Sequence, residues 1–252
     1  MQETLAELYV GADGCRAGWA AALLQPALRS VRLWMVPSFR QLVEDVPAAA
    51  EVWVDIPIGL TGSGATRRLD EAMRASLKER KSSVFPAPCR AALAAQTYPQ
   101  ARELEQLHHA RSLSAQAYHL IPKIREVDEL LQNQPAWRAR VLESHPELCF
   151  QRLNGDQPLR HSKKYPAGWQ ERAELLECYL KGSREAALDL LANTRRAQVQ
   201  PDDVLDALVL AVAAWLNRGE EGGYLRQKES QDAAGIPLRI ACPPLLRCGE
   251  TA

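Results

Sequence analysis

Residues 51–60, EVWVDIPIGL, constrain the fold of this chain more than any other segment. Only Asp55 interrupts the apolar run from position 52 to position 56. A short continuous apolar run is typical of a central strand that is buried on both faces of a sheet. Pro57 cannot donate a hydrogen bond to a sheet ladder, so we expect the strand to end near Asp55 or the next residue.

Three further strands are predicted before this segment. Residues 7–13 form a buried strand that ends at Asp13, and the glycine-containing turn at 14–18 leads into a second apolar run at 19–24. Two strands joined so closely predict a hairpin. Residues 30–36 alternate apolar and polar side chains, which predicts a third antiparallel strand at an exposed edge. A short helix then crosses over, so the strand at 51–56 should run parallel to the first strand.

The rest of the chain is predicted to be mainly helical. We expect a helical insertion over approximately residues 61–137, within which Pro122 should kink or split a long helix. We expect a short strand at 139–144, one or two helices within 169–192, a well-buried helix that starts at Pro201 and a closing strand at 236–242. Without an internal repeat or low-complexity linker, residues 1–252 should form a single α/β domain with a mixed sheet flanked by helices.

Charge and cysteine content narrow the classes of function. Lysine plus arginine equal aspartate plus glutamate, at 31 each, so global electrostatics give no argument for nucleic-acid or membrane binding, although a local basic face stays open. No apolar run approaches the ~18 residues of a membrane-spanning helix, and the start MQETLAELYV lacks the features of a secretory signal. We therefore expect a cytoplasmic protein with reduced thiols and no zinc site, because no CxxC pair occurs among the cysteines Cys15, Cys89, Cys149, Cys178, Cys242 and Cys248.

Acidic residues at the ends of the predicted strands and of the last helix are the strongest candidates for chemistry. They are Asp13, Asp55, Glu143 and the group Asp202, Asp203 and Asp206. Burying a carboxylate is costly unless it is paired or coordinates a metal. Several carboxylates at element ends are the donor set that Mg²⁺ or Mn²⁺ requires, and Asp203 and Asp206 share one helix face.

Each of these residues also has a structural interpretation. Asp13 before Gly14 could form a turn, and Asp55 could accept hydrogen bonds from backbone amides at a strand end. Asp203, like Asp202, could cap its helix and complement the helix dipole. Glu143 could be an exposed strand residue. Spacing alone leaves both interpretations open, because structural networks also gather carboxylates.

Basic and nucleophilic residues carry weaker signals. Arg16 and Lys123, together with Lys163 and Lys164, could bind phosphate, although such side chains are usually solvated. His145 lies between two glutamates and could move protons, but a structural hydrogen bond is the preferred interpretation. No general base is evident for Cys15, so we interpret it as a buried thiol.

Six motifs in order along the chain carry a resemblance to a known family. They are GADGCRAGW at 11–19, VDIPIGL at 54–60, KSSVFPAP at 81–88, PKIREVD at 122–128, ESHPELCF at 143–150 and DDVLDAL at 202–208. Together they resemble the predicted-nuclease family called domain of unknown function 429, over roughly residues 8 to 240. The resemblance implies a ribonuclease H-like fold.

The resemblance also implies roles for particular residues. In nucleases of that fold, Holliday-junction resolvases among them, one carboxylate ends the first strand, another ends the fourth, and a D-x-x-D or H-x-x-D pair opens the last helix. Asp13, Asp55 and the Asp203–Asp206 pair match these positions. Glu143 has no counterpart in that core pattern and belongs to the ESHPE motif, so it could be a ligand, a base or structural.

The leading hypothesis is therefore a metal-dependent nuclease. Two Mg²⁺ or Mn²⁺ ions ~4 Å apart would be bound by Asp13, Asp55 and Asp206, with Asp203 and Glu143 helping. Arg16 or Lys123 would neutralise the phosphate.

Two alternatives remain. A nucleotide-binding or phosphotransfer protein of the actin-like ATPase type would use the GADGCRAG hairpin around phosphate, but such proteins usually need a duplicated domain. A non-catalytic binding protein would explain the absence of net positive charge. Oligomeric state and the choice among DNA, RNA and a small phosphoester are open at this stage.

Overall fold

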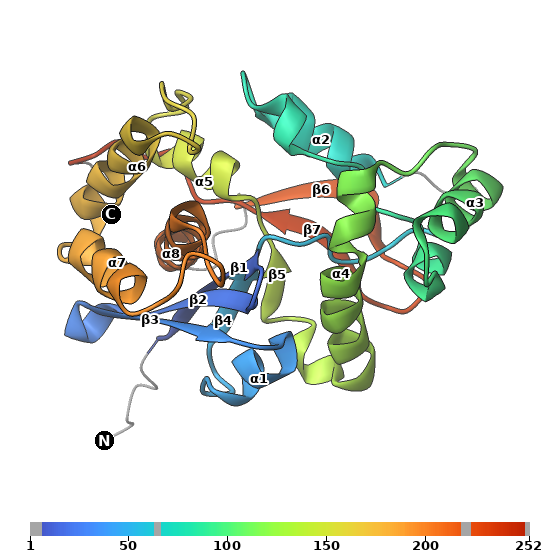
Figure 1. Cartoon of the computed structure of the whole chain (residues 1–252), viewed down its shortest axis with the longest axis horizontal. Helices are drawn as coiled ribbons and strands as arrows, with labels where there is room; N and C mark the ends of the chain where they lie inside the picture. Colours follow the sequence, from blue (N-terminus) through green and yellow to red (C-terminus); the bar gives the residue numbers. More distant parts are fainter. Residues whose placement is uncertain (1–6, 63–66, 218–222, 250–252) are drawn as a thin grey trace.

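The computed structural model describes residues 7–62, 67–217 and 223–249 and contains one mixed seven-stranded sheet flanked by helices (Figure 1). The strand order is β3-β2-β1-β4-β5-β7-β6. The bounds of the strands are Tyr9–Cys15 for β1, Gly18–Gln25 for β2, Ser30–Val36 for β3, Glu51–Val54 for β4, Val141–Glu143 for β5, Tyr224–Gln231 for β6 and Pro237–Ala241 for β7. The prediction of an α/β protein with a mixed sheet is confirmed. Residues 1–6, which belong to the segment that argued against a secretory signal, lie outside the described ranges.

The first half of the sheet has the predicted order and directions. β1, β2 and β3 are antiparallel neighbours, β3 lies at the edge, and β4 pairs parallel to β1. The prediction that β1 ends at Asp13 is wrong by two residues, because antiparallel pairing with β2 continues through Cys15 opposite Gly18. The parallel ladder with β4 does stop at Ala12. Asp13 therefore lies just beyond the parallel ladder, within the closing part of the hairpin.

Eight α-helices cover the sheet in the described part of the chain. Their bounds are Phe39–Glu44 for α1, Arg68–Ser76 for α2, Tyr98–His109 for α3, Ala115–Asn133 for α4, Pro146–Leu153 for α5, Pro166–Tyr179 for α6, Ser183–Ala192 for α7 and Pro201–Asn217 for α8. One buried apolar cluster joins α1 and α4 to one face of the sheet, and a second joins α5, α6, α7 and α8 to the other face (Figure 1). Both faces of β4 are therefore buried, as its apolar run predicts.

The segment between β4 and β5 contains α2, α3, α4 and short 3-10 turns, in the region of the predicted helical insertion. That the insertion and the rest of residues 1–252 form a single domain stays a prediction. Pro122 lies inside α4 without splitting it. Ile121 and Ile124, on either side of the proline, are buried in the apolar cluster beneath the helix. Packing of this face keeps the helix continuous despite the backbone hydrogen bond that a proline removes.

Helix α2 ends at Ser76, because Leu77 adopts an extended conformation and is buried. One element is missing from the predictions. Strand β6 was not predicted at all. Its sequence, YLRQKESQ, is polar and mostly exposed, and it forms the sheet edge by antiparallel pairing with β7.

The helix α8 packs unusually closely on β1. A Cβ atom added to Gly11 would lie 1.9 Å from the carbonyl oxygen of Ala207 and 2.4 Å from the backbone nitrogen of Ala211. Only glycine allows the helix backbone this close to the strand. Because α8 lies almost directly on β1, the carboxylates of its first turns are brought near the end of that strand.

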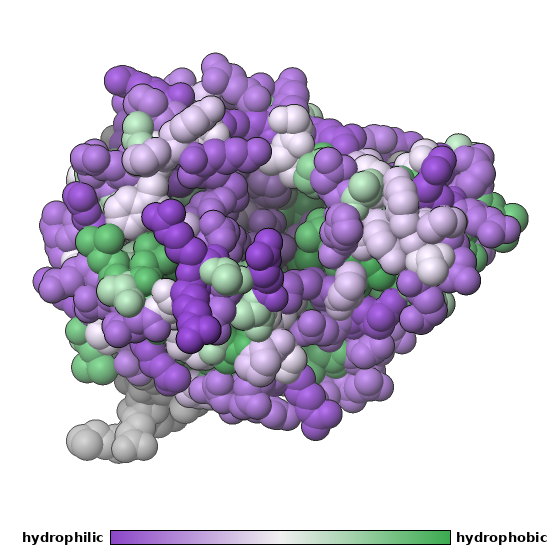
Figure 2. Space-filling view, viewed as in Figure 1, coloured by the Kyte–Doolittle hydropathy of each residue, from purple (hydrophilic) through white to green (hydrophobic). Residues whose placement is uncertain are grey.

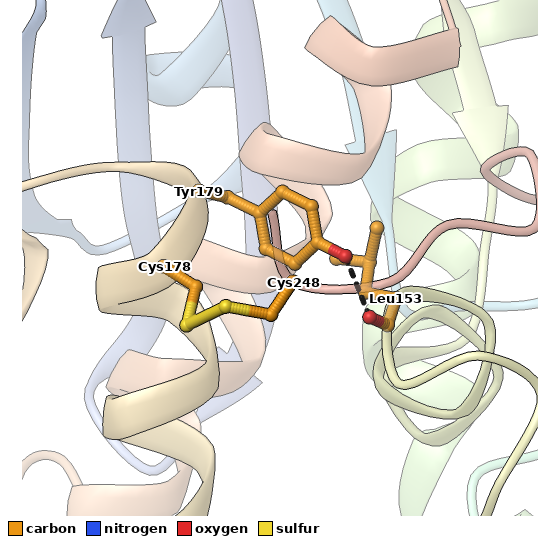
Figure 3. The surroundings of a disulfide bond; sticks show 4 residues. All are labelled: Leu153, Cys178, Tyr179 and Cys248. Atoms are coloured by element: carbon orange, nitrogen blue, oxygen red, sulfur yellow. Dashed lines mark hydrogen bonds between the residues drawn. A yellow bond between two sulfur atoms is a disulfide. The ribbon is translucent and has the colours of Figure 1, made fainter. Parts of the chain in front are cut away.

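A disulfide joins Cys178 of α6 to Cys248 near the end of the chain, with the two Cα atoms 5.7 Å apart (Figure 3). The expectation that all six cysteines are reduced thiols is therefore wrong for this pair. Their separation of 70 residues gave no local sequence signal for the bond. The other four cysteines are free and buried. Among the described residues, no helix has the length and apolar character needed to cross a membrane.

Candidate functional site

A cavity of about 740 Å³ lies where β1, β4 and β5 end at one edge of the sheet. In the space-filling view the surface is hollowed near the centre, between the helices α5 and α6 and the helices α2 and α4 (Figure 2). Its lining includes the predicted site residues Asp13, Asp55, Glu143, Arg16 and Lys123. Asp203 and Asp206 do not line the cavity. The structure thus brings five of the predicted residues to one hollow, and the other two do not line it.

The parallel strands explain why the carboxylates meet. The backbone N–H of Asp55 donates to the carbonyl oxygen of Ala12 at 3.1 Å, which continues the β1–β4 ladder by one bond. Glu143 is the register partner of Val54 on the next parallel strand. Three adjacent parallel strands therefore carry acidic residues at the same end of the sheet, namely Asp13, Asp55 and Glu143.

Helix α8 adds the remaining two carboxylates. Asp206 is buried, and its Oδ1 has no hydrogen-bond partner among the described residues. Asp203 accepts a hydrogen bond from the backbone N–H of Gln200 at 2.8 Å, so one of its oxygens caps the start of α8. The capping interpretation thus holds for Asp203, whereas Asp206 has a free buried acceptor that a structural role does not explain.

The carboxylates of Asp13, Asp55 and Asp206 influence one another electrostatically. Burial raises the pKa of Asp13 well above its usual value, and the charges of Asp206 and Asp55 raise it further. Burial also raises the pKa of Asp55 and raises that of Asp206 to about 7. Like charges that share a poorly solvated site disfavour joint ionisation. A cation placed among them would relieve this repulsion.

Lys163 supplies one such positive charge. Its ammonium group donates to Asp206 Oδ2 and lies 3.6 Å from Asp202 Oδ2. The same charge lowers the pKa values of Asp13 and Asp55. Sequence reasoning considered Lys163 only as a phosphate ligand. No signal in the sequence pairs it with Asp206, which lies 43 residues away.

Glu143 has a different environment, dominated by Arg67. The guanidinium of Arg67 forms ion pairs with Glu143 and with Asp70 and donates to the carbonyl oxygens of Ile58 and Gly59. The backbone N–H of Ile58 also donates to Glu143 Oε2, at 2.8 Å. Arg67 was not among the predicted site residues. The interpretation of Glu143 as an exposed strand residue is wrong, because its side chain is buried in this ion-pair cluster.

Cationic side chains lie at the hairpin side of the cavity. The Nζ atom of Lys123 lies 4.5 Å from the centroid of the Trp19 ring, and the Lys123 side chain packs beside Gly14. Arg16 is exposed in the turn between β1 and β2. His145 Nε2 lies 3.4 Å from Ser83 Oγ, and its buried Nδ1 has no partner among the described residues. Lys123, Arg16 and His145 thus line the same cavity as the carboxylates and can offer donors to an anion.

The carboxylates can be tested for their fit to a divalent cation. Among the described residues, no three His, Cys, Asp or Glu side chains are already arranged around one ion position. The donor chemistry nevertheless fits Mg²⁺ or Mn²⁺, which prefer carboxylate oxygens. Asp206 Oδ1 is buried without a donor, and one ammonium group faces three mutually repelling carboxylates. Asp13, Asp55 and Asp206 are therefore suitable ligands, and Asp203 has one oxygen outside its capping bond.

The comparisons with known proteins identify a family but no activity. The family described as Protein of unknown function (DUF429) matches residues 11–229, which include every residue of the site described above. No curated protein and no solved structure matches the chain. Since the match covers most of the sequence, the chain belongs to the DUF429 family.

Proposed function

We propose that this protein is a metal-dependent nuclease with a ribonuclease H-like fold that hydrolyses phosphodiester bonds. Support for the fold comes from the three antiparallel strands followed by parallel β4 and β5 in the order β3-β2-β1-β4-β5. The observation that carries the chemistry is the buried Oδ1 of Asp206, which has no partner in the described part of the chain and lies beside two further carboxylates of raised pKa.

In this proposal Asp13, Asp55 and Asp206 bind two Mg²⁺ or Mn²⁺ ions, and Asp203 contributes its second oxygen. When bound, the ions supply the Lewis acidity that activates water and stabilises the leaving oxygen. Lys123 and Arg16 hold the non-bridging phosphate oxygens, since both line the cavity. Glu143 shapes the wall through Arg67 and Ile58 instead of binding an ion.

The test is Mn²⁺-dependent hydrolysis of bis(p-nitrophenyl) phosphate and of single-stranded and duplex DNA and RNA. We expect Asp13→Asn to lower the rate by about 10³-fold, because Lewis-acid stabilisation contributes several kcal/mol, while circular dichroism shows an intact fold. Asp70→Asn is the matched control, because Asp70 also lines the cavity but is held by Arg67. Equal rates for Asp13→Asn and the wild type would overturn the proposal.

A thermal-shift assay beside the hydrolysis assay separates the two alternatives. A thermal shift with ATP and Mg²⁺, without one for Mn²⁺ alone, would favour nucleotide binding or phosphotransfer. A protein with neither shift nor hydrolysis would be a binding protein. The proposal includes nucleic acid as a partner. Hydrolysis of the DNA and RNA substrates in the assay tests this part of the proposal.

The cytoplasmic location stays a prediction. The Cys178–Cys248 disulfide argues against this location, because disulfide bonds are rare in reducing compartments.

A further inference from the structure

Lys163 reaches the carboxylates from the loop that precedes α6, and its position is unusual for a lysine. Its side chain keeps 34% of its surface exposed, whereas its partner Asp206 is 1% exposed. The ammonium donates to one oxygen of Asp206, and the other oxygen has no partner within residues 7–62, 67–217 and 223–249. The partly exposed Lys163 therefore compensates negative charge through only one oxygen of Asp206.

A second carboxylate lies within reach of the same ammonium. Asp202 Oδ2 is 3.6 Å from Lys163 Nζ, and the Asp202 side chain is 26% exposed. Lys163 and Asp202 both line another cavity, of about 710 Å³, which also includes Lys164 and Tyr165. The ammonium thus has an alternative partner, and this partner lies in a more solvated position than Asp206.

Charge balance sets a limit on how many ions the cluster accepts. When Asp13, Asp55, Asp203 and Asp206 are ionised they carry four negative charges, and Lys163 supplies one positive charge. One divalent ion therefore leaves a single negative charge, and a second would give the group an excess of one positive charge while the ammonium stays on Asp206. Burial makes such an excess costly.

We propose that Lys163 holds the place of a second divalent cation, which binds only after the ammonium moves from Asp206 to Asp202. This inference rests on the proposed metal-dependent function. It makes Lys163 and Asp202 positioning residues that set the stoichiometry of the site, and it leaves the first ion to Asp13, Asp55 and the free Oδ1 of Asp206.

The experiment counts Mn²⁺ ions bound by the full-length chain, made metal-free with a chelator and titrated at neutral pH while free Mn²⁺ is followed by electron paramagnetic resonance. We expect the wild type to bind one ion tightly and a second weakly. In Lys163→Met the second ion should bind about tenfold more tightly or better, because its competitor is gone. In Asp202→Asn it should bind several-fold more weakly, because the ammonium loses its alternative partner. Lys164→Met, at the exposed neighbouring position, should match the wild type.

The outcomes distinguish this inference from the proposed function. One tight ion in the wild type with no tightening in Lys163→Met would overturn the role of Lys163 and leave the nuclease proposal standing. Two tight ions in the wild type would also overturn it. No Mn²⁺ binding in either protein would overturn both proposals. If Lys163→Met does not fold, Lys163→Arg keeps the charge and a bidentate donor group, so it should weaken the second ion, and an unchanged or tighter second ion would overturn the inference.

Discussion

Two clusters of acidic residues lie at or next to the same cavity, and they are neutralised in opposite ways. In the first, Arg67 pairs with Glu143 and Asp70, and backbone N–H groups donate to both carboxylates. In the second, Asp13 and Asp55 accept no side-chain hydrogen bond from the described residues, and Lys163 reaches only Asp206. The first cluster is saturated with donors, whereas the second is short of positive charge.

The difference shows how one pocket can contain both a structural ion-pair cluster and a cluster with a proposed chemical role. Arginine presents a planar group with several fixed donors, which suits a permanent ion pair. Lysine presents a compact charge on a flexible stem, which can leave without collapsing the wall around it. The type of cation beside a buried carboxylate thus separates the structural role of Glu143 from the proposed ligand role of Asp206.

The largest effect that tests this contrast is the loss of Arg67. Arg67→Met should lower the free energy of unfolding by about 3–5 kcal/mol, because it leaves two buried carboxylates without their partner. Lys163→Met should lower it by about 1 kcal/mol, because the lost pair is one-third exposed on the lysine side. Urea unfolding of both variants at the same pH measures the difference. Equal losses would mean that the two clusters do not differ in kind.

A smaller effect should appear in the pH dependence of stability. Burial raises the pKa of Glu143 from 4.5 to about 7, so the folded state keeps a proton that the unfolded state has released. The stability from this group is fully present below about pH 4.5 and is lost as pH rises through about 7. Glu143→Gln should remove this slope, which is at most ~1.4 kcal/mol per pH unit for one proton.

Denaturant unfolding over that pH range measures the slope, with Glu129→Gln at an exposed position of α4 as the control. Mn²⁺ affinity should be the same in Glu143→Gln and in the wild type. A loss of Mn²⁺ binding would instead place Glu143 among the ligands and remove the distinction between the clusters.

The smallest effect concerns Asp206 without metal. Asp206→Asn keeps an oxygen for Lys163 but removes one of the charges that repel Asp13 and Asp55. We expect the metal-free variant to be more stable by roughly 1 kcal/mol, as is common when a functional site loses a destabilising charge. The stabilisation of the wild type by Mn²⁺ should be absent in the variant. Thermal unfolding with and without Mn²⁺ measures both quantities, and a strong metal-free destabilisation would show that Asp206 is structural.

The sequence predicted the elements whose patterns are local. The apolar run before Asp55 and the alternation in β3 depend on a few neighbouring residues, and both strands form where expected. β6 escaped prediction because its polar residues at a sheet edge lack an apolar period. The position of Asp13 was predicted, but not the two further residues of β1, because only pairing with β2 extends that strand.

The candidate site shows the same division. Asp13, Asp55 and Asp206 were selected because each follows or opens an element that packs on the sheet. Lys163 and Arg67 were not assigned their roles, because Lys163 meets Asp206 across 43 residues and Arg67 meets Glu143 across 76. Such pairings depend on the packing of loops against the sheet edge, which no periodicity in the chain encodes.

The missing side chain at Gly11 has a consequence for the proposed metal site. Contact of α8 with the bare backbone of β1 sets how far Asp206 stands from the end of that strand. An alanine there would push the helix outward and widen the opening between carboxylates carried by different elements. Mg²⁺ demands a tight octahedral shell, while Ca²⁺ accepts a larger and looser one. A single methyl group at Gly11, beside the segments that carry Asp13 and Asp206, would thereby shift the ionic radius that the proposed metal site prefers.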